Sequence, residues 1–321
     1  MWKDDFFRYL AESTTERSYV EEALALKDLH LPTRIYKYRC DTDYSRDNLK
    51  TDTVWMASPE SYNDPYDCAL LLPPDTLLRL IEASVVDPFV AATKLEGIIP
   101  RAEIEKAKKS ARPLESIAEH VQLLGSDAMD FWKSRAGSYS SALARHAQET
   151  VSNIAALRKL AKLCSFSATS DSLLMWSHYA NHHKGFCIEY DLEPLKPDHP
   201  FRHNLYPVVY SKHLYDLTPF AVGLTARDRQ KFQPMLPLIG MLHKFEGWEY
   251  ENEWRMVFEK PNLMDDYAQP VPTPTRIFLG SRFDASESTK LLRVCEEKNI
   301  PISRMRLSNT SFELTAEPFT G

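Results

Sequence analysis

The stretch YENEWRMVF, residues Tyr250 to Phe258, combines the alternation of a β-strand with two glutamates and an arginine. In a strand, successive side chains point to opposite faces of the sheet. One face then carries Tyr250, Asn252, Trp254, Met256 and Phe258, and the other carries Glu251, Glu253, Arg255 and Val257. We expect the first face to pack in a core, whereas the second is either solvent-exposed or lines a binding site.

Two earlier segments, RIYKYR at residues 34–39 and LCSFSA at residues 163–168, divide into two faces in the same way. Their polar side chains are Lys37 and Arg39 in the first segment and Ser165 and Ser167 in the second. Each set by itself is typical of the solvent face of an antiparallel sheet. Together, a basic pair, a hydroxyl pair and a carboxylate pair favour a shared polar site, provided that the three strands meet.

The rest of the chain predicts an α+β fold with a split, mixed or antiparallel β core and a large α-helical insertion. Helical spacing covers the first 30 residues, nearly all of residues 73–162 and a stretch from about Leu217 to Lys244, and shorter helices are expected through DSLLMWSHYAN and DASESTKLLRVCEEKN. Further strands are expected at DTVWMAS, GFCIEYDL, YPVVYS and TRIFLG, and near ISRMRL and SFELTA. We interpret the chain as one composite domain, in which residues 1–72 hold an N-terminal helix and the first core strands, residues 73–162 form the insertion and residues 163–321 complete the core.

Composition and charge limit the class of protein. The 321 residues are 43% hydrophobic and 26% charged, which is ordinary for a globular chain with a buried core. The formal net charge of -6 argues against non-specific coating of nucleic acid, although a local basic groove is compatible with it. Five scattered cysteines without a C-x-x-C pair indicate reduced thiols rather than disulfides or a zinc site. The chain shows neither a signal-peptide pattern nor a run of about 18 apolar residues, so we expect a cytoplasmic protein without a membrane partner.

Several phrases resemble a bacterial family catalogued as domain of unknown function 2971. They are YKYR, VWMASPESYNDPYD, SFSATSDSLLMWSHYANHHKGFCIEYD, VVYS, WEYENEWRMVF and RIFLG, which together span about Tyr36 to Gly280. The most specific phrases are W-S-H-Y-A-x-x-H-x-G and Y-E-x-E-W-R. The resemblance implies relatedness and no particular reaction.

The order of the polar sets is similar to that of the ADP-ribosyltransferase fold, in the class with an arginine, a serine and a glutamate motif. Such proteins carry an Arg on an early strand, a Ser-x-Ser strand leading into a helix, and a Glu-x-Glu strand, around a cleft that holds NAD. This chain departs from the pattern in the Phe at the centre of its Ser-Phe-Ser motif and in the long helical stretch before it. The resemblance implies NAD as a co-substrate, even though the chain lacks the glycine-rich motifs of Rossmann and P-loop sites.

The resemblance assigns catalysis to Glu253 and Glu251. Breaking the bond between nicotinamide and ribose develops positive charge on the ribose, and a fixed carboxylate at Glu253 would stabilise it. Glu251 would orient or deprotonate the acceptor. Arg255 would pair with one carboxylate and keep it ionised, or would contact a phosphate as part of the cofactor site.

The other cofactor-binding residues implied by the resemblance are Arg39, Ser165, Ser167, Tyr179 and Asn63. The guanidinium of Arg39 suits a phosphate or ribose oxygen, and the two serines would position the ribose and support their strand. Each residue also has a structural interpretation. Arg39 would form a salt bridge with Glu251 or Glu253, Tyr179 would be part of a hydrogen-bonded structural cluster, and Asn63 with Asp64 would stabilise a turn before Pro65.

Two alternatives stay open. His178 and His182 would share a helix face if that helix extends to both, a spacing that can bind zinc in a nuclease or hydrolase that also uses Glu253. No glutamate or cysteine accompanies them at helical spacing, and we expect no metal. In the other alternative the protein is a non-enzymatic interaction module that binds a partner through residues 73–162.

Our leading hypothesis is an NAD-dependent ADP-ribosyltransferase that modifies a protein or nucleic-acid acceptor, as a bacterial toxin or an anti-phage defence effector. The geometric requirement is plain. Arg39, Ser165 and Glu253 have to line one pocket.

Overall fold

The computed structural model describes residues 2–13, 17–121, 126–160, 162–221, 233, 235–258 and 265–319, and these form a mixed α+β fold. Its centre is a sheet of eight strands in the order β14-β13-β12-β5-β1-β4-β10-β6. The strands are β1 Arg34–Arg39, β4 Lys162–Ser167, β5 Phe186–Asp191, β6 Leu205–Pro207, β10 Glu253–Phe258, β12 Arg276–Leu279, β13 Ile302–Leu307 and β14 Leu314–Pro318. β12 and β13 pair in parallel, and the other neighbours pair antiparallel, so the sheet is mixed.

Three smaller sheets of two strands each lie beside the main one. They pair β2 Thr53–Met56 with β11 Tyr267–Pro270, β3 Leu70–Leu71 with β8 Tyr215–Asp216, and β7 Val209–Ser211 with β9 His243–Phe245. The last pair matters for the site, because its register sets Lys244 opposite Tyr210. The hydroxyl of Tyr210 in turn accepts a hydrogen bond from the backbone N–H of Glu253 at 2.8 Å. Lys244 is thereby fixed next to the start of β10.

The main sheet is split between β1 and β4. β1 pairs with β5 along its whole length, and β10 pairs with β4 along its whole length, whereas β1 and β4 pair only at Tyr36 and Ser167. Beyond that pair the two strands separate toward Arg39. Lys37 reaches across the gap, and its Nζ donates a hydrogen bond to the carbonyl oxygen of Ser165 at 2.5 Å. The lysine side chain thus provides the hydrogen bond that a backbone N–H of β1 would give to this carbonyl group if the two strands paired regularly.

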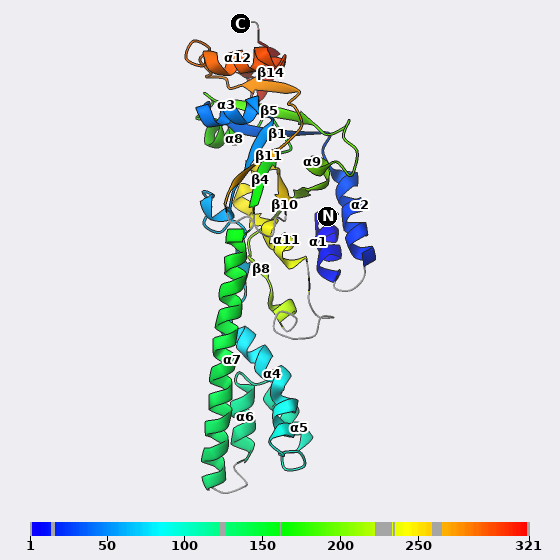
Figure 1. Cartoon of the computed structure of the whole chain (residues 1–321), viewed down its shortest axis with the longest axis vertical. Coiled ribbons are helices and arrows are strands. Elements are labelled where there is room, and N and C mark those ends of the chain that lie inside the picture. The colour runs from blue at the N-terminus through cyan, green and yellow to red at the C-terminus, as the bar shows by residue number, and fades with distance from the viewer. Residues whose placement is uncertain are drawn as a thin grey trace.

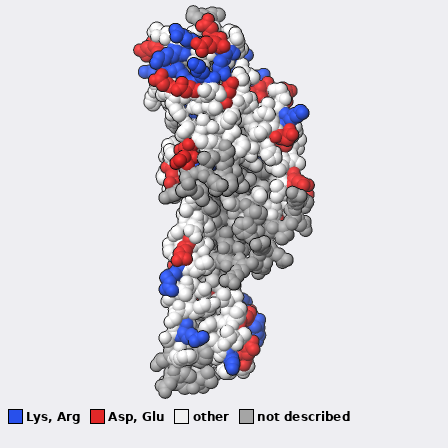
Figure 2. Space-filling model, in the orientation of Figure 1, with Lys and Arg blue, Asp and Glu red and all other residues white. Residues whose placement is uncertain are grey.

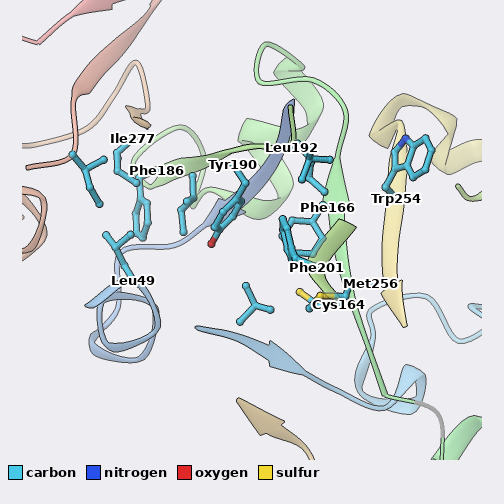
Figure 3. Packing of buried hydrophobic residues seen from close by; sticks show 14 of the residues in the cluster. Leu49, Cys164, Phe166, Phe186, Tyr190, Leu192, Phe201, Trp254, Met256 and Ile277 are labelled. Atoms are coloured by element: carbon cyan, nitrogen blue, oxygen red, sulfur yellow. The ribbon is translucent and has the colours of Figure 1, made fainter. Parts of the chain in front are cut away.

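Both faces of the sheet are covered. On one face, Phe166, Met256 and Trp254 pack with Phe201 and Tyr190 in a large apolar cluster (Figure 3). On the other face, Leu163 and Val257 pack in a second cluster with residues of the N-terminal helices and of the long helices described below. A third cluster around Tyr38 and Trp176 covers the other side of β1 and β5. Strands buried on both faces leave little of their polar side open to solvent.

The helices outside the long arm lie around the sheet (Figure 1). They are α1 Trp2–Glu12, α2 Arg17–His30, α3 Asp43–Lys50, α8 Leu173–Tyr179, α9 Pro200–His203, α11 Leu236–Met241 and α12 Thr289–Glu297, with 3-10 turns η1 Pro59–Ser61, η3 Thr218–Phe220 and η5 Glu246–Glu251. None of the helices in the described ranges has the length and apolarity that crossing a membrane requires.

The surface charges in view gather mainly at one end of the molecule. Figure 2 shows Lys and Arg side chains with Asp and Glu beside them at the end where α3 and α12 lie. Several of these charges are paired, because Lys290 contacts Asp43 at 3.3 Å and Lys298 contacts Asp52 at 2.9 Å. We therefore do not interpret that end as an open basic surface.

The helical segment between the strands projects from the sheet as a long arm (Figure 1). It contains α4 Pro74–Ala92, α5 Arg101–Lys108, α6 Pro113–His120 and α7 Ser126–Leu160. The arm has its own apolar cluster, which includes Val86, Leu114 and Ala136. Within it the buried carboxylate of Glu82 accepts hydrogen bonds from Ser140 Oγ and from the backbone N–H of Leu114.

The opening stretch is only partly a strand. β10 begins at Glu253, whereas Glu246–Glu251 form the turn η5, and Asn252 adopts a left-handed conformation with φ 44°. The predicted strand over Tyr250–Phe258 is therefore wrong in its first three residues, because a left-handed residue, which Asn tolerates better than most, reverses the chain there. The predicted core positions of Trp254 and Met256 are confirmed.

Other boundaries differ as well. The predicted N-terminal helix is two helices, α1 and α2, and YPVVYS forms β6 and β7 in different sheets. Of the predicted helical stretch from Leu217 to Lys244, residues 222–232 and 234 lie outside the described residues. The described part holds η3 and α11 and then ends in β9 rather than in helix, because the pairing of His243–Phe245 with β7 outweighs local propensity.

Candidate functional site

A cavity of about 410 Å³ lies where β1 and β4 separate. Seven of the eight site residues that the sequence predicted line it: Arg39, Asn63, Ser165, Ser167, Tyr179, Glu251 and Glu253. They come from β1, from the turn after η1, from β4, from α8 and from the junction between η5 and β10. Residues of all three polar sets line the cavity, but they come from both faces of the sheet. The pairing of Tyr36 with Ser167 puts Lys37 and Arg39 on the face opposite Ser165 and Glu253, so they line the cavity at the gap between β1 and β4.

Glu253 is an ionised carboxylate at the start of β10. It lies opposite Ser167 in the sheet register and is only 1% exposed. Its Oε1 accepts a hydrogen bond from Arg255 Nε at 2.7 Å, and its Oε2 accepts one from Lys244 Nζ at 2.9 Å. Burial alone would raise the pKa of Glu253, but the charges of Arg255 and Lys244 outweigh it and lower that pKa well below the usual glutamate value. The side chain is therefore a fixed negative charge at the cavity wall.

Glu251 has the opposite electrostatic character. It is 3% exposed, and its Oε1 accepts a hydrogen bond from Tyr179 Oη at 2.6 Å while Oε2 accepts one from Lys244. Burial raises the pKa of Glu251, and the nearby charge of Glu253 raises it further against the opposing effect of Lys244. Two neighbouring carboxylates whose pKa values are driven apart are suited to different roles, one as a permanent anion and one as a proton carrier.

Arg255 lies behind the cavity rather than in it. Its side chain has no exposed surface and contacts the carboxylates of Glu253 and Asp67, each at 2.7 Å. It also donates to the carbonyl oxygen of Met241 at 2.6 Å. The prediction that Arg255 binds the cofactor is wrong, because the second face of β10 is buried against other elements. The alternative prediction, that Arg255 pairs with a carboxylate, is the arrangement found.

Lys244 and Asp67 complete the charged network, and the sequence did not predict either. Lys244 Nζ lies 3.8 Å from the Asp67 carboxylate and contacts both glutamates of the site. Three buried carboxylates face two buried cations, so one negative charge is uncompensated when all are ionised. This excess adds to the effect of burial, which is the main cause of the raised pKa of Glu251. Asp67 stands in the turn-rich SPESYNDPYD, and Lys244 stands in a segment predicted as helix.

Arg39 is the cation of the cavity that has no partner. Its side chain is half-buried and makes no hydrogen bond or ion pair within the ranges that the structure describes. The alternative of a salt bridge with Glu251 or Glu253 is therefore not what the structure shows there. Lys37 also lines the cavity, and burial lowers its pKa. A half-buried guanidinium that pairs with no carboxylate of the described residues is available to bind an anionic ligand.

The two serines differ in their bonding. Ser167 Oγ donates to the carbonyl oxygen of Glu251 at 2.7 Å and accepts from the N–H of Thr169, so it ties η5 to β4. Ser165 Oγ is buried in the cavity wall and has no hydrogen-bond partner among the described residues. The same hydroxyl lies close enough to Glu253 and Tyr62 to lower the pKa of each of these side chains.

Aromatic rings form two walls of the cavity. Tyr44 and Trp55 pack edge to face with ring centroids 5.5 Å apart, and both line the cavity. Tyr62, Tyr179 and His178 line it as well. His178 is held in place because its Nδ1 forms a hydrogen bond with Tyr250 Oη at 2.8 Å.

His178 and His182 do not share a helix face. α8 ends at Tyr179, and Asn181, His182 and His183 follow in the left-handed region, with φ between 47° and 69°. His182 is exposed and does not line the cavity. The trio of His178, His182 and Glu253 that the hydrolase alternative needs is therefore not assembled.

The phrase W-S-H-Y-A-x-x-H-x-G builds the turn from α8 into β5. Trp176 Nε1 donates to the carbonyl oxygen of Ser170 at 2.8 Å, and His183 bonds to the hydroxyl of Ser177 at 3.2 Å. Gly185 has to be glycine, because a Cβ there would lie 2.2 Å from the carbonyl oxygen of Arg39. The backbone at the start of β5 therefore lies directly against the backbone of Arg39 at the end of β1, which fixes the position of Arg39.

Comparison with known proteins gives one match. No curated protein and no solved structure matches the chain. The one matching segment, residues 175–256, includes most of α8, all of β5 and both site glutamates. Residues 175–256 are similar to the family described as "Protein of unknown function (DUF2971)", and this match supports a relationship to that family.

Proposed function

We propose that the protein cleaves NAD between nicotinamide and ribose and transfers ADP-ribose to a macromolecular acceptor. The observation that carries this proposal is that Arg39, Ser165 and Glu253, from three separate strands, line one cavity. In that cavity we assign three groups to a ligand: an arginine that has no ion pair among the described residues, a buried hydroxyl and a permanently charged carboxylate.

Glu253 would supply the main catalytic effect. In the reaction, the bond between the ribose C1 and the ring nitrogen breaks, and its electron pair stays with nicotinamide, which leaves uncharged. Positive charge then develops on the ribose, where a fixed anion stabilises it more than it stabilises neutral substrate. Oε1 of Glu253 accepts one hydrogen bond from Arg255, so it keeps a lone pair for a ribose hydroxyl.

Glu251 would accept the proton. A bond forms between the ribose C1 and a nucleophilic atom of the acceptor, and that atom loses its proton to Glu251. When water is the nucleophile, the water oxygen loses a proton to Glu251 in the same way, and the product is free ADP-ribose. Because its pKa is raised, the ionised form of Glu251 is a stronger base than an ordinary glutamate. The arrangement thus separates the stabilising carboxylate from the proton acceptor.

The remaining cavity groups suit the rest of NAD. Arg39 would bind the pyrophosphate through its planar donors, with Lys37 nearby as a second cation. Tyr44 and Trp55 offer ring surfaces for a base or a nicotinamide ring. Ser165 Oγ, in the same cavity wall as Glu253, would bond to a ribose oxygen.

Replacing Arg39 tests the binding role. Arg39→Met is expected to raise the KM for NAD about a hundredfold, because a charge-assisted contact to phosphate is lost. The melting temperature should stay close to that of wild type, since Arg39 has no ion pair to lose. Arg34→Met is the matched control: Arg34 lies on the same strand with a side chain 56% exposed and a contact 3.9 Å from Glu189. Equal KM values for the two variants would contradict a role of Arg39 in binding.

The pH profile tests the role of Glu251. Because the pKa of Glu251 is raised, kcat/KM for NAD-dependent transfer should rise with pH through a value above the ordinary glutamate pKa of 4.5. Glu251→Gln should remove this acid limb and lower the rate about a hundredfold. A profile with the same acid limb in Glu251→Gln would show that another group is titrating. Degradation of RNA or DNA that needs His178, without NAD turnover, would favour the hydrolase alternative instead.

A further inference from the structure

A second cavity, of about 340 Å³, lies on the other side of Lys244. Lys244 lines both cavities, so its side chain is part of the wall between them. Asn63 faces the first cavity and Asp64 the second, which places the turn SPESYNDPYD at the boundary. We refer to the second cavity as the Asp64 cavity. A ligand in it lies beside the charged network of the first site without occupying it.

Asp64 gives this cavity a buried hydrogen-bond acceptor. The residue is 7% exposed. Its Oδ1 accepts a hydrogen bond from the backbone N–H of Tyr66 at 2.8 Å, which is the expected side-chain turn. Its Oδ2 is buried and has no hydrogen-bond partner in the described parts of the chain. A buried carboxylate oxygen without a hydrogen-bond partner destabilises the folded state unless a donor group reaches it.

Aromatic side chains surround the same cavity. Tyr66 is 65% exposed and Phe245 is 53% exposed, which is unusual for rings of this size, and Trp248 also lines the cavity. Exposed rings around a concave site are surfaces on which a planar ligand stacks. Neither exposed ring is needed for the apolar clusters, because Tyr66 and Phe245 belong to none of them.

The charged side chains that line the Asp64 cavity are Asp64 itself, Lys212 and Lys244. Lys212 and His213 line it and are exposed, and Lys244 forms its inner wall. Lys212 is only loosely paired, since its Nζ lies 3.7 Å from Glu246 with 71% of its side chain exposed. Lys244 is already paired with Glu251 and Glu253, so Lys212 is the cation of this cavity that a phosphate can contact. The combination favours a ligand that is planar, carries hydrogen-bond donors and is attached to phosphate.

We propose that the Asp64 cavity binds a base of a single-stranded nucleic acid. The base stacks on Tyr66, the most exposed of the three rings, its exocyclic amino group donates to Asp64 Oδ2, and the neighbouring phosphate contacts Lys212. Binding one unstacked base, with one phosphate at Lys212, needs no extended basic surface. It is therefore compatible with a net charge of -6, which argues against non-specific binding of duplex DNA. The further step, in which this base or its nucleotide accepts ADP-ribose, rests on the proposed function.

The test measures binding of fluorescently labelled eight-residue deoxycytidine and deoxythymidine oligonucleotides to the full chain at low salt. Wild type should bind oligo(dC) more tightly than oligo(dT), because thymine has no exocyclic amino group. Tyr66→Ala should weaken both about tenfold through loss of stacking. Phe312→Ala is the matched control: this ring is 98% exposed, lies outside the cavity and should leave both affinities unchanged.

Asp64→Asn separates base recognition from stacking. The Asp64→Asn variant should show a smaller preference for oligo(dC) over oligo(dT). The control is Asp198→Asn, which changes an exposed carboxylate outside both cavities and should keep the wild-type preference. Equal binding by wild type, Tyr66→Ala and Phe312→Ala would overturn the proposal, and so would displacement of the oligonucleotide by an arginine-rich peptide but not by unlabelled oligonucleotide. The assay contains no NAD, so its outcome is independent of whether the first cavity cleaves NAD.

Discussion

Glu253→Gln is expected to lower the rate of NAD cleavage about a thousandfold, because it removes the fixed charge that would stabilise the developing cation on ribose. The amide keeps the size of the carboxylate and can still accept from Arg255. Release of nicotinamide from NAD by the purified chain measures the effect directly. NAD binding should persist, since the pyrophosphate contacts of Arg39 are untouched.

The matched control for this variant is Glu189→Gln. Glu189 is also a buried carboxylate of the main sheet, 4% exposed on β5, but it lies outside the cavity. The Glu189→Gln variant should therefore cleave NAD at nearly the wild-type rate. Circular dichroism of both variants would show whether each keeps the fold. A folded Glu253→Gln protein with undiminished cleavage would remove Glu253 from the catalytic role.

Arg255→Met is expected to destabilise the fold by about 3–5 kcal/mol, the usual effect of removing one member of a buried ion pair. The guanidinium is fully buried and neutralises Glu253 and Asp67, and its loss leaves one cation, Lys244, facing three carboxylates. Urea unfolding at neutral pH measures the change. Arg276→Met is the control, since its side chain is 41% exposed and lies 4.0 Å from Glu189, and it should cost less than about 1 kcal/mol.

The deficit of Arg255→Met should depend on pH with a definite sign. The folded-state pKa of Glu253 is lowered, so its contribution to stability in wild type is present above the ordinary pKa of 4.5 and is lost as the pH falls through the folded value. Without Arg255 that contribution shrinks, so the stability difference between variant and wild type should be largest near pH 7 and should decrease as the pH falls below 4.5 toward the folded-state pKa of Glu253. A difference that stays constant with pH would mean that lost packing, not lost charge, causes the destabilisation.

The strand patterns predicted much of the fold and of the site. Alternation in RIYKYR, LCSFSA and YENEWRMVF identified β1, β4 and β10, and residues of all three strands line one cavity. Parity did not show that Lys37 and Arg39 lie on the face opposite Ser165 and Glu253, because that depends on the pairing of Tyr36 with Ser167. The alternation of side chains between two faces is a local property of a strand, so it does not depend on contacts with the rest of the chain. The α+β class followed from the same alternation interrupted by long helical segments.

The parts that the sequence did not predict depend on contacts between distant segments. Lys244 reaches the site only because β9 pairs with β7, and its segment has helical spacing. Asp67 and Arg255 meet behind β10, although strand parity alone suggested that Arg255 faces the cleft. Parity says which side chains share a face but not whether that face is solvent, cleft or core. The left-handed turn at Asn252, which sets Glu251 beside Lys244, is likewise fixed by tertiary packing.

The most direct test of NAD binding in the cavity between β1 and β4 is a crystal structure of the Glu253→Gln variant grown with NAD, because the slow variant keeps the dinucleotide intact. We predict NAD in that cavity, with its pyrophosphate at Arg39, a ribose oxygen at Ser165 Oγ and the nicotinamide ribose at residue 253. An empty cavity at saturating NAD, or NAD bound elsewhere on the molecule, would contradict the proposed function.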